Sequence, residues 1–204
     1  MRSKKLIPTF FLGAIVLCSS CALNNPNEGK AVNSENAETV SVANAPKDLI
    51  ERGRYLVLVG GCAHCHSPKK MTEHGPEPDM DRFMMGYPAD QPLPKYRQDE
   101  ISNGWILMNG DLTATIGPWG ITYAANLTPH ETGIGNWSYD HFKRALVEGK
   151  YKGEETTRML MPPMPWQDNG QMSDEDMRAM FAYLQSLKPI ENVVPAYTPP
   201  TAMK

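Results

Sequence analysis

The residues best suited to chemistry in this 204-residue chain are two cysteines and a histidine in the run Cys62-Ala63-His64-Cys65-His66. C-x-x-C-H is the spacing at which two thiols attach covalently to the vinyl groups of haem c. The two cysteines present both sulfurs to one edge of the porphyrin, and the next residue offers an imidazole to the iron. The run therefore predicts one covalently bound haem c, with His66 as an axial iron ligand.

Paired cysteines have other uses, and three alternatives stay open. A zinc site would need a fourth ligand besides Cys62, Cys65 and His66, commonly from a second C-x-x-C or H-x-x-x-H pair, and the sequence has none. A thioredoxin-like redox pair should follow a buried strand, whereas the residues before Cys62 have a helical pattern. The third alternative is a structural disulfide between the two cysteines.

Residues 1–21 have the pattern of an export signal, which fits the attachment of haem c outside the cytoplasm of bacteria. Three basic residues precede an apolar stretch of about a dozen residues, which is short for a membrane span. Small residues precede Cys21, as in a bacterial lipobox, so we expect a lipid on Cys21 and a lipoprotein anchored on the periplasmic side of a membrane. The run Ser20-Cys21-Ala22 also fits the cleavage site of an ordinary secreted protein.

The rest of the chain divides into three parts. Residues 22–45 lack aromatic residues and are rich in Asn, Ala, Ser and Glu, which predicts a flexible tether. Residues 46–190 have the length of one domain and contain no second C-x-x-C-H, so we expect one haem there, followed by a C-terminal tail over 191–204. Without the signal the chain has 17 basic against 23 acidic residues, a net charge of −6, which disfavours nucleic acid as a partner.

Three helices are predicted around the cysteine motif. Apolar residues and glycines recur at helical spacing from Leu49 up to the cysteines. Ser138 is suited to cap a second helix that ends near Gly149. Ser173, which three acidic residues follow, begins a third helix whose apolar face runs to Leu187. The predicted fold class is therefore all-α.

This order of helix, haem motif, long loops, middle helix, methionine-bearing loop and last helix resembles that of class I cytochromes c. The resemblance implies a cytochrome c fold with three or more helices around one haem. It also implies that the first and last helices cross, with a small residue of one helix against an aromatic residue of the other. Gly53 with Phe181 or Tyr183 would make that contact.

A more specific resemblance lies in two runs of the chain. N-L-T-P at residues 126–129 and T-G-I-G-N-W-S at residues 132–138 resemble the N-L-T-P…T-G-I-G-x-W-S signature of one bacterial cytochrome c group. That group includes electron carriers and the haem subunits of periplasmic alcohol and sugar dehydrogenases. The likeness extends over nearly the whole expected domain.

The resemblance also implies a second axial iron ligand, usually a methionine sulfur, in the loop before the last helix. Within the run Met-Pro-Pro-Met-Pro-Trp at residues 161–166, Met164 matches the P-x-M-P-[YW] position of the family. We therefore expect Met164 to be the ligand, with Met161 as the second choice. His130 or His141 would ligate iron only in a bis-histidine variant, and surface positions are favoured for both.

Residues 69–119 depart from a minimal cytochrome c, because they insert a long segment without a strong helical pattern. Such a segment would cover the haem edge or form a docking surface. Met80, Met84 and Met85 in it could be soft copper ligands, although packing is the favoured explanation.

These patterns favour an electron carrier over an enzyme, because no acid/base or nucleophile constellation accompanies the cysteines. We predict a periplasmic monohaem c-type cytochrome that transfers single electrons between redox partners, such as a dehydrogenase, an oxidase or a respiratory complex. One alternative is a haem subunit permanently bound to a periplasmic dehydrogenase, with residues 69–119 at the interface. Others are a haem sensor or catalyst with a displaceable sixth ligand, and a zinc lipoprotein without haem.

Overall fold

The computed structural model describes residues 45–203, and the structural findings below concern these residues. The expected signal peptide, the lipid site at Cys21 and residues 22–44 of the expected tether lie outside them. Within the described residues, no helix combines the length and the apolar character needed to cross a membrane.

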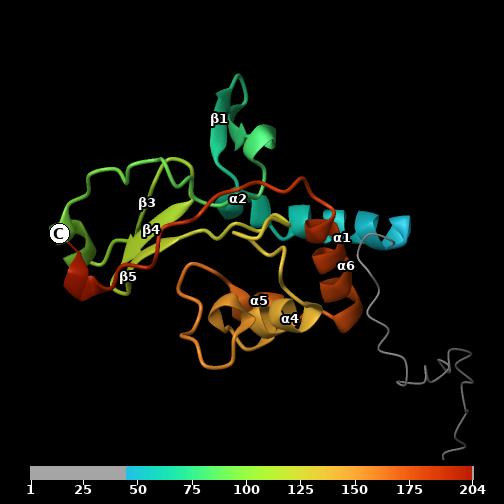
Figure 1. Ribbon diagram of the computed structural model, residues 1–204. Helices are drawn as coiled ribbons and strands as arrows, with labels where there is room; N and C mark the ends of the chain where they lie inside the picture. Colours follow the sequence, from blue (N-terminus) through green and yellow to red (C-terminus); the bar gives the residue numbers. More distant parts are fainter. Residues whose placement is uncertain (1–44, 204) are drawn as a thin grey trace, which may run out of the picture. The chain divides into compact units, whose positions relative to one another are not determined.

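Helices and two small sheets alternate along the described chain (Figure 1). The helices are α1 (Lys47–Val59), α2 (Cys62–His66), α3 (Gln98–Ser102), α4 (Tyr139–Val147), α5 (Trp166–Asn169) and α6 (Asp174–Gln185). Short 3-10 helices lie at Met80–Arg82 (η2), Tyr151–Gly153 (η3) and Pro200–Ala202 (η4). The strands are β1 (Lys69–Thr72), β2 (Gly75–Pro78), β3 (Leu107–Met108), β4 (Ala114–Gly117) and β5 (Gly120–Tyr123).

The predicted fold class is confirmed for the helical part, which is consistent with a cytochrome c fold, but the two sheets were not foreseen. β1 and β2 form an antiparallel hairpin, and β3, β4 and β5 form an antiparallel sheet in that order. These strands have two to four residues each, so no alternating pattern of useful length exists in the sequence. The segment expected as a loop insertion therefore contains most of the sheet structure.

The predicted contact between the first and last helices is present (Figure 1). Gly53 of α1 is buried, and an ideal Cβ at this position would lie 1.9 Å from the carbonyl oxygen of Ala179 and 2.8 Å from Cβ of Tyr183. Of the two aromatic partners expected for Gly53, Tyr183 is therefore the one at the crossing. Phe181 packs against Phe142 of α4 instead, with ring centroids 5.3 Å apart.

The predicted helix starts are also confirmed. Ser138 caps α4, accepting a hydrogen bond from the backbone N–H of His141, whose ring accepts one from the backbone N–H of Ser138. Ser173 caps α6 by accepting from the N–H of Asp176. Both are short-range contacts, which is why the sequence alone indicated them.

The apolar core joins α1, α4 and α6 to the loops around α2. Its buried members are Val57, Ala63, Met84, Ile134, Phe142, Leu146, Met177, Met180, Phe181 and Leu184. Packing is confirmed for Met84 and Met85, which are buried, whereas Met80 is 70% exposed.

Candidate functional site

The cysteine motif forms its own short helix directly after α1. Gly61 adopts a left-handed backbone conformation, with φ of +70°, and this turn lets α2 start at Cys62 with only two residues between it and the end of α1. Cys62 and Cys65 lie one helical turn apart, so their side chains share a face of α2. Both are free and partly exposed thiols.

Burial raises the pKa of both Cys62 and Cys65 above the usual value of a thiol. Redox-active and metal-binding cysteines have the opposite property, a lowered pKa that favours the thiolate. Within residues 45–203, no group of three or more His, Cys, Asp or Glu side chains is arranged to hold a metal ion. Neither observation supports the thioredoxin-like or the zinc alternative.

His66, the last residue of α2, is buried and has a fixed ring orientation. Its Nδ1 donates a hydrogen bond to the carbonyl oxygen of Ala125, at 2.8 Å, so Nε2 is the nitrogen left for a metal. Burial lowers the pKa of His66, with the hydrogen bond to Ala125 acting in the opposite direction. The ring is therefore held in the neutral form that ligates metals.

The segment 84–87 ties α2 to the chain around Ala125. The N–H of Gly86 donates to the carbonyl oxygen of His66 at 2.9 Å, and the N–H of Met84 donates to Oγ of Ser67 at 2.9 Å. From the other side, the N–H of Leu127 donates to the carbonyl oxygen of Met84 at 2.8 Å. Segment 84–87 therefore lies between the cysteine motif and the N-L-T-P run.

Two buried amide side chains stabilise these loops. Asn126 accepts hydrogen bonds from the N–H and the hydroxyl of Thr128 and donates to the carbonyl oxygen of Ile190 at 2.8 Å. Asn192 donates to the carbonyl oxygens of Met85 and Tyr87 at 2.7 and 2.9 Å. Asn126 was part of the recognised motif, whereas no local pattern distinguished Asn192.

The methionine loop is bound to the same stretch of chain as His66. Oγ1 of Thr122 in β5 donates to the carbonyl oxygen of Pro162 at 3.0 Å, three residues before Ala125 receives the hydrogen bond from His66. Met164 is partly buried against the apolar core, and Met161 is partly buried as well. Residues 122–125 therefore contact both the histidine that ends α2 and the loop that carries the expected methionine.

The other histidines have local roles. His64 is exposed. The ring of His130 is hydrogen-bonded to the hydroxyl of Thr132 at 2.9 Å, and the ring of His141 takes part in the cap of α4. His130 and His141 are half-buried, and both rings have Nδ1 engaged by a neighbouring hydroxyl.

The residues present fit a covalently bound haem. A class I haem site requires two thiols, an imidazole and a thioether. The chain offers two thiols on one face of α2, a buried imidazole with a free Nε2, and a half-buried thioether near the core.

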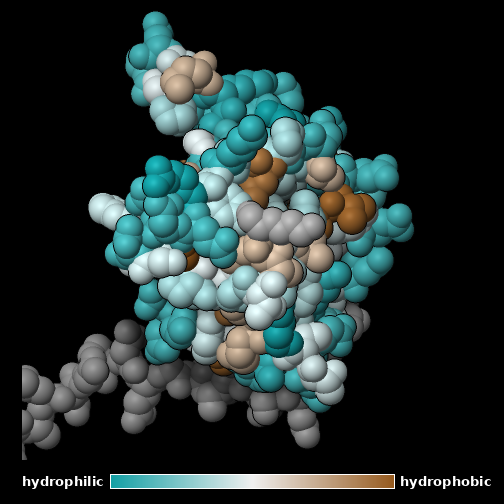
Figure 2. Space-filling view, turned by 90° about the vertical axis from the view of Figure 1, so that its left-hand side faces the viewer, coloured by the Kyte–Doolittle hydropathy of each residue, from teal (hydrophilic) through white to brown (hydrophobic). Residues whose placement is uncertain are grey.

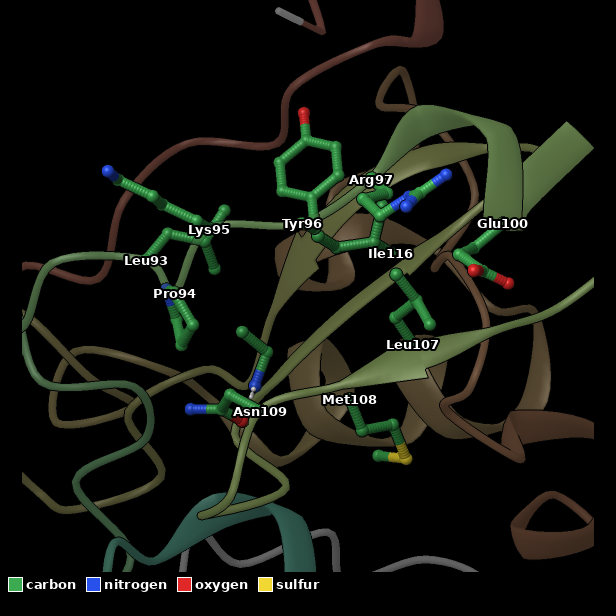
Figure 3. Close-up of a pocket in the computed structure, with 11 residues that line it drawn as sticks. Leu93, Pro94, Lys95, Tyr96, Arg97, Glu100, Leu107, Met108, Asn109 and Ile116 are labelled. Carbon is green, nitrogen blue, oxygen red and sulfur yellow. Dashed lines mark hydrogen bonds between the residues drawn. The ribbon is translucent and has the colours of Figure 1, made fainter.

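The insertion contains a separate pocket of about 340 Å³ (Figure 3). Leu107, Met108 and Ile116 of the sheet and the preceding segment from Leu93 to Arg97 line it, and none of the haem-motif residues does. Figure 2 shows apolar side chains at the surface on this side of the molecule, below a mostly hydrophilic projection. Because all of its lining residues lie between Leu93 and Ile116, the pocket is a feature of the insertion and not of the candidate site.

Three relatives are informative about this arrangement. The gluconate 2-dehydrogenase cytochrome c subunit of Pantoea cypripedii is 34% identical over 136 residues, which are 66% of this chain and 22% of the relative. The fructose dehydrogenase cytochrome subunit of Gluconobacter japonicus is 28% identical over 152 residues, 73% of this chain and 24% of the relative. The cytochrome c subunit of the alcohol dehydrogenase (quinone) of Gluconobacter oxydans is 29% identical over 164 residues, 78% of this chain and 26% of the relative.

The chain is similar to cytochrome c subunits of dehydrogenases. It spans only about a quarter of the length of these relatives. No family model matches it. The resemblance to c-type cytochromes, predicted from the cysteine motif and the order of helices, is confirmed at this level.

Proposed function

We propose that this chain is a monohaem c-type cytochrome of the N-L-T-P group, which carries single electrons from a periplasmic dehydrogenase to a respiratory acceptor. The observation that carries the proposal is the environment of His66. A buried, neutral imidazole whose Nδ1 is bound by the carbonyl of Ala125 presents Nε2 for ligation, at the end of a helix that bears two thiols. Similarity to cytochrome c subunits supports the same proposal.

Cys62 and Cys65 would hold the haem covalently, and His66 and Met164 would be its axial ligands, with Met161 as the second choice. The bound haem would supply a one-electron redox couple. The hydrogen bond from His66 to Ala125 orients the imidazole, and the hydrogen bond from Thr122 to Pro162 holds the methionine loop to the same segment. Because one segment restrains both ligand-bearing parts, little reorganisation is expected when the charge changes.

Export to the periplasmic side, removal of residues 1–21 and a lipid on Cys21 belong to the same proposal. A lipid anchor would keep the protein near membrane-bound redox partners. Labelled palmitate added to the expressing host and followed into the wild-type protein, with Cys21→Ala as the control, measures this directly.

A second candidate function is that of a haem subunit held permanently in a dehydrogenase complex. Two observations favour it. The relatives are cytochrome c subunits of dehydrogenases. The insertion also exposes the apolar side chains of Trp105, Ile106 and Met108. Purification from the native membrane discriminates the two functions, because a permanent subunit co-purifies with a larger catalytic subunit.

The ligand assignment is tested by absorption spectra of the oxidised, reduced and carbon monoxide-treated protein, made in a host with haem-attachment machinery. We expect wild type to be six-coordinate and indifferent to carbon monoxide, and Met164→Ala to become high-spin and bind it. Met161→Ala is the matched control, since it removes the neighbouring methionine of the same loop and should leave the spectra unchanged.

The other results are equally informative. If Met161→Ala, and not Met164→Ala, opens the iron to carbon monoxide, then Met161 is the ligand. If wild type already binds carbon monoxide, a sensor or catalyst is favoured over a carrier. A colourless protein from such a host would refute haem binding altogether.

A further inference from the structure

Lys69, the first residue of the insertion, contacts the cysteine-motif helix through its side chain. Its ammonium nitrogen lies 2.7 Å from the carbonyl oxygen of His64, 2.5 Å from that of Ser67 and 3.4 Å from that of Ala63. The residue is only partly exposed. An ammonium group that donates to several carbonyls at once is held in one position.

These contacts occur where α2 needs partners. The last four carbonyl groups of an α-helix receive no hydrogen bond from an N–H of the same helix. Because α2 has only five residues, most of its carbonyls need partners elsewhere. The carbonyl of His66 accepts from the N–H of Gly86, and the carbonyls of Ala63 and His64 face the ammonium of Lys69. Lys69 and Gly86 together therefore close the end of the helix on which His66 lies.

The same ammonium also binds the insertion. It lies 3.1 Å from the carbonyl oxygen of Asp111, and the N–H of Lys69 donates to the Asp111 carboxylate at 3.3 Å. Asp111 lies in the turn between β3 and β4, where Oδ1 of Asn109 accepts from the N–H of Ala114 at 2.9 Å. Lys69 is thus the joint between α2 and the three-stranded sheet.

The charge of Lys69 is not cancelled by a direct ion pair. Within residues 45–203, no carboxylate oxygen lies within 4.0 Å of its ammonium nitrogen. The adjacent Lys70 differs, because its side chain is 55% exposed and pairs with Asp79 and Asp81 at 2.7 and 2.9 Å. The two neighbouring lysines therefore form a matched pair for experiments.

We propose that Lys69 is a positioning residue of the haem site, which fixes the end of α2 to the insertion and raises the reduction potential by its charge. This inference rests on the proposed function. Oxidation of a bound haem adds a positive charge, and a cation held nearby, partly out of water, makes that addition less favourable. The insertion then has a role in tuning the site as well as any role in docking.

The test compares the midpoint potentials of the holoprotein in wild type, Lys69→Gln, Lys70→Gln and Lys69→Arg. For Lys69→Gln we expect the one-electron equilibrium to shift towards the oxidised form by about tenfold, equal to about 59 mV. Lys70→Gln should shift it less than about twofold, since its charge is exposed and paired. Lys69→Arg keeps the charge and should lie closer to wild type than Lys69→Gln does.

A second measurement, hydrogen exchange, reports on the positioning role independently of the reduction potential. In nitrogen-15 NMR spectra of the wild-type holoprotein, the ammonium protons of Lys69 should exchange with water more slowly than those of Lys70. In Lys69→Gln, the amide proton of Gly86, bound to the carbonyl of His66, should exchange faster than in Lys70→Gln.

Each contrary result overturns the inference in a recognisable way. Equal potential shifts in Lys69→Gln and Lys70→Gln would mean that net charge alone acts. Ammonium protons that exchange equally fast in both lysines would exclude the fixed contacts. A wild-type protein that acquires no haem would refute the proposed function before any variant is compared.

Discussion

The helical part and the loop part of this chain are stabilised in different ways. In α1, α4 and α6 the backbone polar groups bond within each helix, and buried apolar side chains hold the helices together. The loops outside these helices have fewer internal partners, and three buried asparagines supply them: Asn109 in the insertion, and Asn126 and Asn192 beside the candidate site. Apolar contacts hold the helices together, and hydrogen bonds from side-chain amides hold the loops in place.

Asn192 illustrates how specific the second kind of stabilisation is. It donates to two carbonyls of the segment 85–87 and accepts from the N–H of Ala89 at 2.9 Å. Gly86, which binds the carbonyl of His66, lies between those two carbonyls. The loop part is therefore sensitive to single polar atoms, whereas the helical part is sensitive to shape.

The largest effect is expected from Gly53→Ala, which attacks the shape of the helical part. The added methyl group would meet the main-chain oxygen of Ala179 at 1.9 Å, and a main-chain atom cannot move away unless α1 and α6 separate. We expect the free energy of unfolding to fall by about 4 kcal/mol or more. Urea unfolding followed by circular dichroism measures it.

Gly110→Ala is the matched control for this substitution. A Cβ at Gly110 would have no neighbour within 4 Å, so we expect a change within about 0.5 kcal/mol. Similar losses for both alanines would mean that close helix packing is not what limits stability at Gly53.

Asn192→Ala tests the loop part and should have the next largest effect. It leaves two carbonyls and one N–H without their partner in a buried place, which should cost about 2 to 3 kcal/mol. Asn103→Ala, at an exposed asparagine directly after α3, should stay within about 0.5 kcal/mol in the same unfolding experiment. If the two variants are equally stable, side-chain amides do not stabilise the loops as argued.

Hydrogen exchange locates the effect of Asn192→Ala. The amide protons of Gly86 and Ala89 should lose protection, while those in the middle of α6 should keep theirs. Loss of protection throughout the chain would contradict the separation between the two parts.

The same division decides what the sequence could predict. The caps Ser138 and Ser173 and the thiols of the cysteine motif involve residues a few positions apart, so their patterns are readable locally. The hydrogen bond from Asn192 to Met85 joins residues 107 positions apart, and no periodicity signals such a contact. Met164 was reached only through a resemblance, because thirteen methionines compete for the role of ligand.

The smallest effect is expected at the surface of the helical part, where Asp174 begins α6. Its carboxylate accepts from Lys143 at 2.6 Å, Arg178 at 2.7 Å and the hydroxyl of Tyr139 at 2.8 Å. These hydrogen bonds hold the pKa of Asp174 well below its ordinary value of 3.8. The hydrogen bond from Lys143 has the largest effect. Folding therefore favours the ionised form of Asp174. The contribution of this carboxylate to the free energy of unfolding is fully present above pH 3.8 and is lost as the pH falls towards the lowered pKa of the folded protein.

Asp174→Asn tests this contribution by urea unfolding between pH 7 and pH 2. The Asp174 side chain is 45% exposed, so solvent screening limits the loss at pH 7 to about 0.5 to 1 kcal/mol. The difference from wild type should shrink as the pH falls below 3.8, because the unfolded wild-type chain then binds a proton at Asp174 that the folded protein does not bind. Asp168→Asn, at an exposed aspartate without an ion pair among the described residues, should show no such trend. A difference that persists undiminished at low pH would assign the role of Asp174 to hydrogen bonding, and the ion cluster between α4 and α6 would then add nothing to apolar packing.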